Sequence, residues 1–502
     1  MLFNSVTFVI FFLITFLIYY LPLLKKWQVP ILVIASFIFY AWSSPALLIL
    51  LIISILLNAW SSYKVANTLN KKQRFWWATL GVIINLTILG LFKYAGLFTK
   101  VFLDLFNLSP TDDSFLQVLL TLPLPVGISF YTFQGISLVI DVLREQEGRE
   151  LQETDTSPSH FAHTDWKSYL LDTSFFISLF PQLVAGPIVK AHDFFPQIQP
   201  KYFQNIRWDI VFRCLVIGYF LKMVIADNLK DYTFWINYPY YQGMGTITLV
   251  VLLLGYSMQI FADFAGYSLI AIGLGAALGY TLPQNFNFPY ISRSLSEFWT
   301  RWHISLSTWL KSYLYIPLGG NRKGNVRTYF NLMIVMALGG LWHGAGWSYA
   351  VWGIYHGVGL AIERFLHLNR RNSNFTEQSA PLWQQFIRDF LQILLIFSFV
   401  SLGWLLFKLP RFDQALDFLV TMGKNLTIRP QMGQVVPVLI FSLPVLIYHG
   451  LNFPTWKQLN PQSVRLGSYR LTWIWDHLAL GLMLVAILIN SGSSGAFIYF
   501  QF

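Results

Sequence analysis

The sequence predicts an all-α protein that crosses a membrane many times. Hydrophobic residues make up 55% of the 502 residues and charged residues only 11%, whereas ordinary soluble domains are roughly 25% charged. The mean hydropathy is +0.53. Apolar runs long enough to cross the roughly 30 Å hydrocarbon core of a bilayer recur along the chain, and we count about eleven. We expect one integral-membrane domain over residues 1–502, with re-entrant and interfacial helices around a central channel.

Charge and cysteine content exclude several classes of protein and site. The net charge of +11 would suggest a nucleic-acid partner in a soluble protein. Here the Lys and Arg clusters border apolar runs, so anionic lipid headgroups and the positive-inside rule explain them, and we expect no nucleic acid. The single cysteine, Cys214, lies in an apolar run and supports neither a disulfide framework nor a thiolate metal site. His160 and His163 lack a further ligand cluster, and we predict no metal site.

The N-terminal third predicts the orientation of the chain. No basic segment precedes the apolar run 6–21 and no small-residue cleavage site follows it, so it is interpreted as a first span and not a signal peptide. Lys25 and Lys26 follow this span, and a second basic cluster at residues 64–74 follows the third span. Because two spans separate the two basic loops, both lie on one side, which the positive-inside rule makes cytoplasmic. The N-terminus is therefore predicted outside an inner (plasma) membrane.

The remaining spans are less regular. Pro123 and Pro125 interrupt an apolar run, and proline removes a backbone donor and kinks a helix, so we expect a broken or re-entrant segment beside a cavity. Residues 141–167 are acidic and rich in Ser and Thr, and they predict a mobile soluble loop. The absence of an evident internal repeat disfavours transporters built from inverted repeats. Other spans are expected near residues 76–98, 169–189, 210–225, 247–280, 386–406, 435–449 and 472–489.

The stretch from Glu297 to His356 contains the strongest functional signal. No formally charged residue lies between Arg327 and Glu363, and one continuous helix of that length would measure about 50 Å, which exceeds the bilayer core. The run must therefore break, and four glycines mark the break: Gly339, Gly340, Gly344 and Gly346.

His343 lies inside this predicted break, flanked by Trp342 and Trp347. An ionisable group at membrane depth on irregular backbone is by default a functional-site hypothesis. A second such group is Asp263, a carboxylate in an apolar span, which we expect to pair with a basic or donor group from another helix.

An amphipathic helix precedes this break. Ser294 and Glu297 form a capping box at its start. Its apolar face is predicted to hold Trp299, Trp302, Leu306, Trp309, Leu310, Tyr313 and Leu314, and its polar face Arg301, Ser305, Thr308, Lys311 and Ser312. Such a helix lies along an interface. His303 falls on the apolar edge, which is consistent with a functional group or with a hydrogen-bonded core histidine.

Pro317 ends this helix, and a basic glycine-rich turn follows at residues 319–324. Such a turn could hold a phosphate or could simply be a positive loop on the cytoplasmic side. Neither a Walker A pattern nor a dinucleotide fingerprint is present, and both interpretations stay open.

Several segments resemble the membrane-bound O-acyltransferase (MBOAT) family in order along the chain. FWTRWHISLSTWLKSYLYIPLGGNRKGN and LGGLWHGAGWSYAVWGIYHG carry the resemblance most densely. FPQLVAGPIVKAHDFFPQI, QIFADFAGYSLIAIG and LPQNFNFPYISRSLSEFW extend it upstream, so the core covers about residues 123–357. Within the family the chain resembles the membrane component of bacterial alginate O-acetylation and the D-alanyl transfer protein of the teichoic-acid pathway. Leu269 departs from the acidic residue usual in the alginate branch, which leaves the acceptor open.

The resemblance implies transfer of an acyl group, most simply acetyl, from a cytoplasmic thioester such as acetyl-CoA to a hydroxyl of an exported polysaccharide. No bound cofactor is implied, and a periplasmic or extracellular acyltransferase is an expected partner. The family's near-invariant histidine falls on His343, which becomes the expected general base, and its second polar position on His303. The substrate or channel lining is expected at Asp263, Asn285, Arg293, Trp299, Trp302, Ser305, Trp342, Trp347 and His356, and the donor side at Asn321, Arg322 and Lys323.

Two alternatives remain from the residues alone. A polytopic transporter or flippase of a polysaccharide-modification system would show solute-dependent flux and would not require His343. A non-catalytic scaffold for an exported modifying enzyme would tolerate loss of both central histidines.

Overall fold

The computed structural model describes residues 1–42, 45–109, 114–151, 161, 165–371, 381–409, 411–453, 469–492 and 497. All regular elements in these ranges are helices, so the all-α prediction is confirmed. Residue contacts divide the chain into two compact units, one of residues 1–212 and 270–283 and one of residues 213–269 and 284–502. Each unit is described separately.

Six helices in the described ranges are long and apolar enough to cross a membrane. They are Pro22–Ala41, Pro45–Asn67, Lys71–Phe106, Thr246–Ala277, Trp383–Lys408 and Met432–Gly450. Two further apolar helices, Val6–Tyr19 and Trp475–Ile489, are shorter. The protein is therefore a multi-pass membrane protein. The span predicted near residues 169–189 is interrupted at Leu179 and its helix ends at Leu183, whereas the one near residues 210–225 is continuously helical and becomes π-helical at Phe220.

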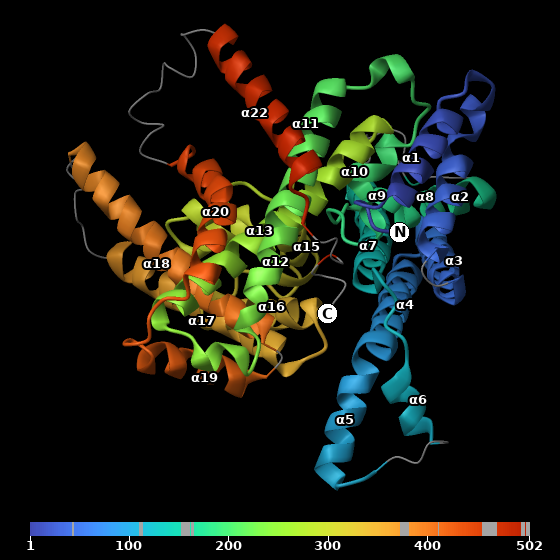
Figure 1. The fold of residues 1–502 in the computed structure, drawn as a ribbon. Helices are drawn as coiled ribbons and strands as arrows, with labels where there is room; N and C mark the ends of the chain where they lie inside the picture. Colours follow the sequence, from blue (N-terminus) through green and yellow to red (C-terminus); the bar gives the residue numbers. More distant parts are fainter. Residues whose placement is uncertain are drawn as a thin grey trace. The chain divides into compact units, whose positions relative to one another are not determined.

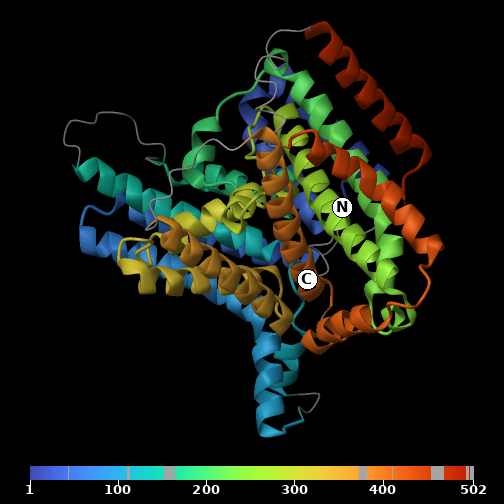
Figure 2. The ribbon, with the colours of Figure 1, turned by 90° about the vertical axis from the view of Figure 1, so that its left-hand side faces the viewer.

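The first unit begins with the helices labelled in Figure 1: α1 (Val6–Tyr19), α2 (Gln28–Ala41), α3 (Pro45–Asn67), α4 (Lys71–Leu89), α5 (Ala95–Phe106), α6 (Phe115–Thr121), α7 (Ile128–Leu151), α8 (Trp166–Ser178), α9 (Phe180–Leu183) and α10 (Ala191–Phe194). A π-helical turn at Gly90–Tyr94 joins α4 to α5, and both views show these helices following one another as one rod (Figure 2). The helix predicted to break at Pro123 and Pro125 does so between α6 and α7.

The predicted soluble loop at residues 141–167 is wrong over its first part, because α7 continues to Leu151 and α8 begins at Trp166. Asp141 is 5% exposed, and its Oδ2 lies 2.9 Å from Nδ1 of His192. This hydrogen bond raises the pKa of His192. Asp141 is therefore a buried residue of helix α7, paired with the half-exposed His192, and not part of a solvated loop. Residues 152–160 and 162–164, with His160 and His163, lie outside the described residues.

The second unit holds the stretch singled out in the sequence. Its helices are α12 (Asp227–Thr233), α13 (Thr246–Ala277, up to residue 269), α14 (Leu295–Arg301), α15 (Ile304–Leu310), α16 (Gly324–His343), α17 (Trp347–Arg371), α18 (Leu382–Lys408), α19 (Phe412–Lys424), α20 (Met432–Gly450) and α22 (Tyr469–Ile489). The helix α11 (Trp208–Tyr219) and the π-helical segment Phe220–Ala226 lead into this unit.

Helices α16 and α17 form a tightly packed hairpin, and glycines allow their close approach. A Cβ atom on Gly340 would lie 2.2 Å from the carbonyl oxygen of Tyr349, and one on Gly353 would lie 2.2 Å from that of Met336. The predicted break is therefore confirmed at Gly344, next to the end of α16, whereas Gly340 lies inside the helix. Glycine is needed at Gly340 and Gly353 because the backbone of the neighbouring helix leaves no room for a side chain.

Candidate active site

His343 is the last residue of α16 and is 5% exposed. Its ring centre lies 5.0 Å from that of Trp342, 5.2 Å from that of Trp352 and 5.3 Å from that of Phe407. These aromatic rings come from α16, α17 and α18 and fix the imidazole in a mostly apolar site. A histidine placed at the end of a helix, beside a glycine break, can face a cavity while its backbone N–H stays hydrogen-bonded within the helix.

His303 lies close to His343, with 6.2 Å between ring centres. It is fully buried, and its ring packs edge-on against Phe264 at 4.6 Å. The continuous interfacial helix predicted here is wrong, because His303 has φ 44° and separates α14 from α15. The left-handed backbone also overturns the helical-wheel reasoning: Ser305, predicted on the polar face, is only 5% exposed.

Asn285 holds the chain in this conformation. Its Oδ1 accepts hydrogen bonds from the backbone N–H and the hydroxyl of Ser305, at 3.2 and 2.6 Å. Its carbonyl oxygen accepts from the N–H of Ile304 at 3.0 Å, and its Nδ2 donates to Oγ of Ser268 at 3.0 Å. A left-handed conformation is costly for a residue other than glycine. Asn285, predicted as channel lining, therefore serves in the structure to position the start of α15 and with it His303.

We expect Asn285→Ala to destabilise the protein and to lower acyl transfer, because it leaves the buried N–H of Ser305 without its acceptor. An unsatisfied buried donor costs about 1–3 kcal/mol. Ser268→Ala is the matched control, since it removes only the outer hydrogen bond of Asn285. Thermal unfolding in detergent should rank wild type, S268A and N285A in that order. Equal unfolding temperatures for the two variants would contradict the role given to Oδ1.

Asp263 has the basic partner that the sequence required. Nζ of Lys222 lies 2.8 Å from Oδ1 of Asp263 and 2.8 Å from Oδ1 of Asp227. All three side chains are at most 7% exposed. Lys222 belongs to the π-helical segment Phe220–Ala226 and Asp263 to α13, so this ion triad joins separate helices inside the second unit. Its geometry indicates a structural role, and Asp263 does not line the cavity described next.

A cavity of about 640 Å³ leads to His343 within the second unit. Its buried end is formed by His343, Gly339, Val335 and Trp352. Gly339 precedes His343 by one helical turn and so lies on the same face of α16. A Cβ atom on Gly339 would touch only Leu310, at 3.3 Å, so the absence of a side chain leaves space beside His343.

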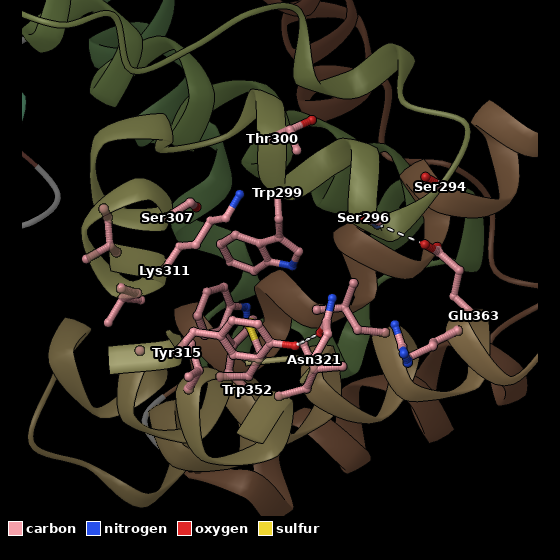
Figure 3. A pocket seen from close by; sticks show the side chains of 18 of the residues that line it. Ser294, Ser296, Trp299, Thr300, Ser307, Lys311, Tyr315, Asn321, Trp352 and Glu363 are labelled. Atoms are coloured by element: carbon pink, nitrogen blue, oxygen red, sulfur yellow. Dashed lines mark hydrogen bonds between the residues drawn. The ribbon is translucent and has the colours of Figure 1, made fainter. Parts of the chain in front are cut away.

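The other end of the cavity is exposed and polar (Figure 3). Lys311, Thr300 and Asn321 line it and are exposed, and the half-buried Arg364 also lines the cavity. The carboxylate of Glu363 accepts hydrogen bonds from the N–H groups of Leu295 and Ser296 at 2.5 and 3.1 Å. Among the lining residues Lys311 and Arg364 are basic and Glu363 is acidic, so the formal charge of the lining is positive.

The basic glycine-rich turn reaches the cavity at Asn321, whose Oδ1 accepts a hydrogen bond from the Tyr315 hydroxyl. Nδ2 of Asn331 donates to the carbonyl oxygen of Gly320 at 3.0 Å and holds the turn. Gly319 and Gly320 have φ values of 105° and 52°, which glycine adopts at little cost. Arg322 and Lys323 are exposed and do not line the cavity.

The family model for the membrane-bound O-acyltransferase family, MBOAT, matches residues 111–405. The chain belongs to this family. It is an O-acyltransferase, and the matched residues include every side chain described at the cavity.

Relatives of this MBOAT chain act on different polymers. The probable alginate O-acetylase AlgI of Pseudomonas putida is 35% identical over the full length of both chains. The peptidoglycan O-acetyltransferase of Helicobacter pylori is 34% identical over 100% of this chain and 98% of its own length. The teichoic acid D-alanyltransferase of Bacillus subtilis is 29% identical over 56% of this chain and 68% of its own length.

Several residues expected at the MBOAT substrate path lie elsewhere. Trp347 is 61% exposed, so it does not flank His343 as predicted, because the chain turns at Gly344 before α17 begins. Arg293 lies 3.5 Å from Asp389 and 3.8 Å from Glu297, in ion pairs outside the cavity. Trp302, Trp342 and His356 are buried and pack against other aromatic rings but do not line the cavity.

Of the predicted set, the MBOAT cavity contains His343, Trp299 and Asn321. Sequence reasoning missed Lys311 as a lining residue, because an ideal helix placed it on a solvent face. It also gave no role at the site to Trp352, Glu363 or Arg364, and it assigned Gly339 only to the predicted break. The one available signal was spacing: Gly339 stands four residues before His343, and Glu363 and Arg364 end the long uncharged run.

Proposed function

We propose that this O-acyltransferase moves an acetyl group from a cytoplasmic thioester to a hydroxyl of an exported cell-surface polysaccharide, with His343 as general base. One observation carries the proposal: among the described residues that line the cavity, His343 is the one histidine, and it is buried in a cavity whose lining also includes the basic residues Lys311 and Arg364. The alginate and peptidoglycan O-acetylating relatives support acetyl as the acyl group and a polysaccharide as the acceptor.

The chemistry needs a base and a dry site. A sugar hydroxyl is a weak nucleophile, so the imidazole of His343 takes its proton as the oxygen attacks the thioester carbonyl carbon. A C–O bond forms, the tetrahedral intermediate collapses, the C–S bond breaks, and the protonated imidazole returns the proton to the leaving sulfur. General-base catalysis of this kind raises the reaction rate about 10²–10⁴-fold. His303, at 6.2 Å between ring centres, belongs to the same site as an orienting group.

The cavity suits a thioester with a phosphorylated carrier arm. It follows α16 from Leu332 to His343, a rise of about 16 Å for eleven residues. Its walls are apolar along Leu310 and Val335, and its lining also includes Lys311 and Arg364, which complement phosphate. Acetyl-CoA or an acyl-carrier thioester would therefore enter from the end of α16 where Arg322 and Lys323 lie.

By the positive-inside rule, the basic residues support a cytoplasmic location for this end of the cavity. The acceptor, alone or presented by a periplasmic or extracellular partner acyltransferase, then meets His343 from the outer side of an inner membrane, and the N-terminus lies outside. A cysteine probe at position 322, in a Cys214→Ala background, should react only with reagents that enter the cytoplasm. A probe at the exposed Ala345 should react from outside. Labelling of position 345 only from the cytoplasm would refute this orientation.

Two measurements test the reaction itself. Analysis of ester groups on cell-surface polysaccharide should show their loss when the gene is deleted, their return with the wild-type chain, and no return with His343→Gln. The purified full-length protein should release free thiol from acetyl-CoA only when the polysaccharide is added. Unchanged ester content in the deletion strain would refute the function, and flux of an unmodified solute would favour a transporter.

A further inference from the structure

Two indole rings that line the cavity have N–H groups without a hydrogen-bond partner among the described residues. Trp299 and Trp352 both line the cavity, with ring centres 5.7 Å apart and ring planes at 74°. Nε1 of each is buried and has no hydrogen-bond partner among the described residues. Figure 3 shows the Trp299 indole projecting into the middle of the cavity.

Buried donors without an acceptor are rare because they forfeit the hydrogen bonds they made with water. Trp352 is only 1% exposed, so bulk water does not satisfy its N–H. The remaining acceptor is a group that enters the cavity. Since the ring of Trp352 also packs edge-on against His343 at 5.2 Å, that group would sit beside the imidazole.

We propose that the indole N–H groups of Trp299 and Trp352 donate hydrogen bonds to the carbonyl oxygen of the donor thioester. This inference rests on the function proposed above and extends it. When the acceptor oxygen bonds to the carbonyl carbon, the C=O electron pair moves onto the carbonyl oxygen. The two indole N–H groups stabilise the negative charge that forms there. The charge returns to the C=O bond as the C–S bond breaks.

Indole suits this task in three ways. Its N–H donates and cannot accept, so it favours an oxyanion over a hydroxyl. It does not titrate, so it does not compete with His343 for the proton. Its large apolar rings exclude water, which strengthens a hydrogen bond to a developing charge.

The test uses the full-length protein with acetyl-CoA and the polysaccharide acceptor. Trp299→Phe and Trp352→Phe each keep an aromatic ring and remove one N–H. Loss of one such donor typically lowers kcat about 10²–10³-fold, so we expect a fall of at least about tenfold in each variant with KM changed less than about threefold. Replacement of either residue by benzothienylalanine, in which sulfur takes the place of N–H, keeps the ring shape and should give the same fall.

Trp309→Phe is the matched control, since Trp309 is a buried tryptophan of α15 that does not line the cavity. It should keep kcat within about threefold. The proposal fails if the benzothienylalanine variants retain wild-type kcat, because the rings then act by packing or hold only a water molecule. It also fails if the variants raise KM without lowering kcat. A wild-type protein that transfers nothing from any thioester would instead refute the proposed function.

Discussion

His343→Gln should lower acyl transfer at least about 100-fold, the least expected from loss of a general base. Glutamine keeps a polar side chain of similar length but cannot take the hydroxyl proton at neutral pH. Because His343 lies at the end of α16 beside Gly344, its replacement does not disturb the glycine contacts that join α16 and α17. We therefore expect near wild-type thermal stability. The measurement is ester formation by purified protein, normalised to folded protein.

His449→Gln gives the matched control for this change. His449 is a buried histidine of α20, 4% exposed, with Nδ1 2.8 Å from the carbonyl oxygen of Val445. It does not line the cavity. H449Q should keep activity within about tenfold of wild type at a modest cost in stability. If H343Q retains more than about a tenth of the activity, His343 is not the base.

Lys222→Met should cause the largest loss of stability. It leaves the carboxylates of Asp227 and Asp263 buried beside each other without the cation that lies 2.8 Å from each. Removal of one partner from a buried ion pair costs about 3–5 kcal/mol, because the remaining charge has neither water nor a partner. We expect aggregation in detergent or a clearly lowered unfolding temperature.

A partly exposed lysine and a compensating variant control for this effect. Lys230→Met removes a lysine whose pair with Asp231, at 3.9 Å, is partly exposed, and such pairs contribute about 0–1 kcal/mol. The triple variant K222M/D227N/D263N should recover part of the lost stability, since it removes the buried charges as well. Equal stability of K222M and K230M would show that the triad is not a major stabilising contact.

Features that depend on local composition and on short residue spacing could be predicted from the sequence. Long apolar runs predicted the all-α membrane fold, because the backbone of a helix forms all its hydrogen bonds within the segment that crosses the bilayer. The uncharged run from Arg327 to Glu363 required a break, and the glycines before Trp347 located it. The buried charge of Asp263 required a cation, although only the structure identified Lys222.

Which side chains share the site depends on contacts between residues far apart in the sequence. His303 and His343 are forty residues apart, and their 6.2 Å separation depends on the left-handed backbone at His303 and on its anchoring by Asn285. A regular-helix pattern does not show such a kink, so it placed Ser305 outside and excluded Lys311 from the cavity. The same limit applies to Gly339 and Gly340, which are adjacent in the sequence. Gly339 leaves space beside His343, whereas the space beside Gly340 is filled by the backbone of α17. That difference comes from what packs against each residue, because the residues themselves are identical.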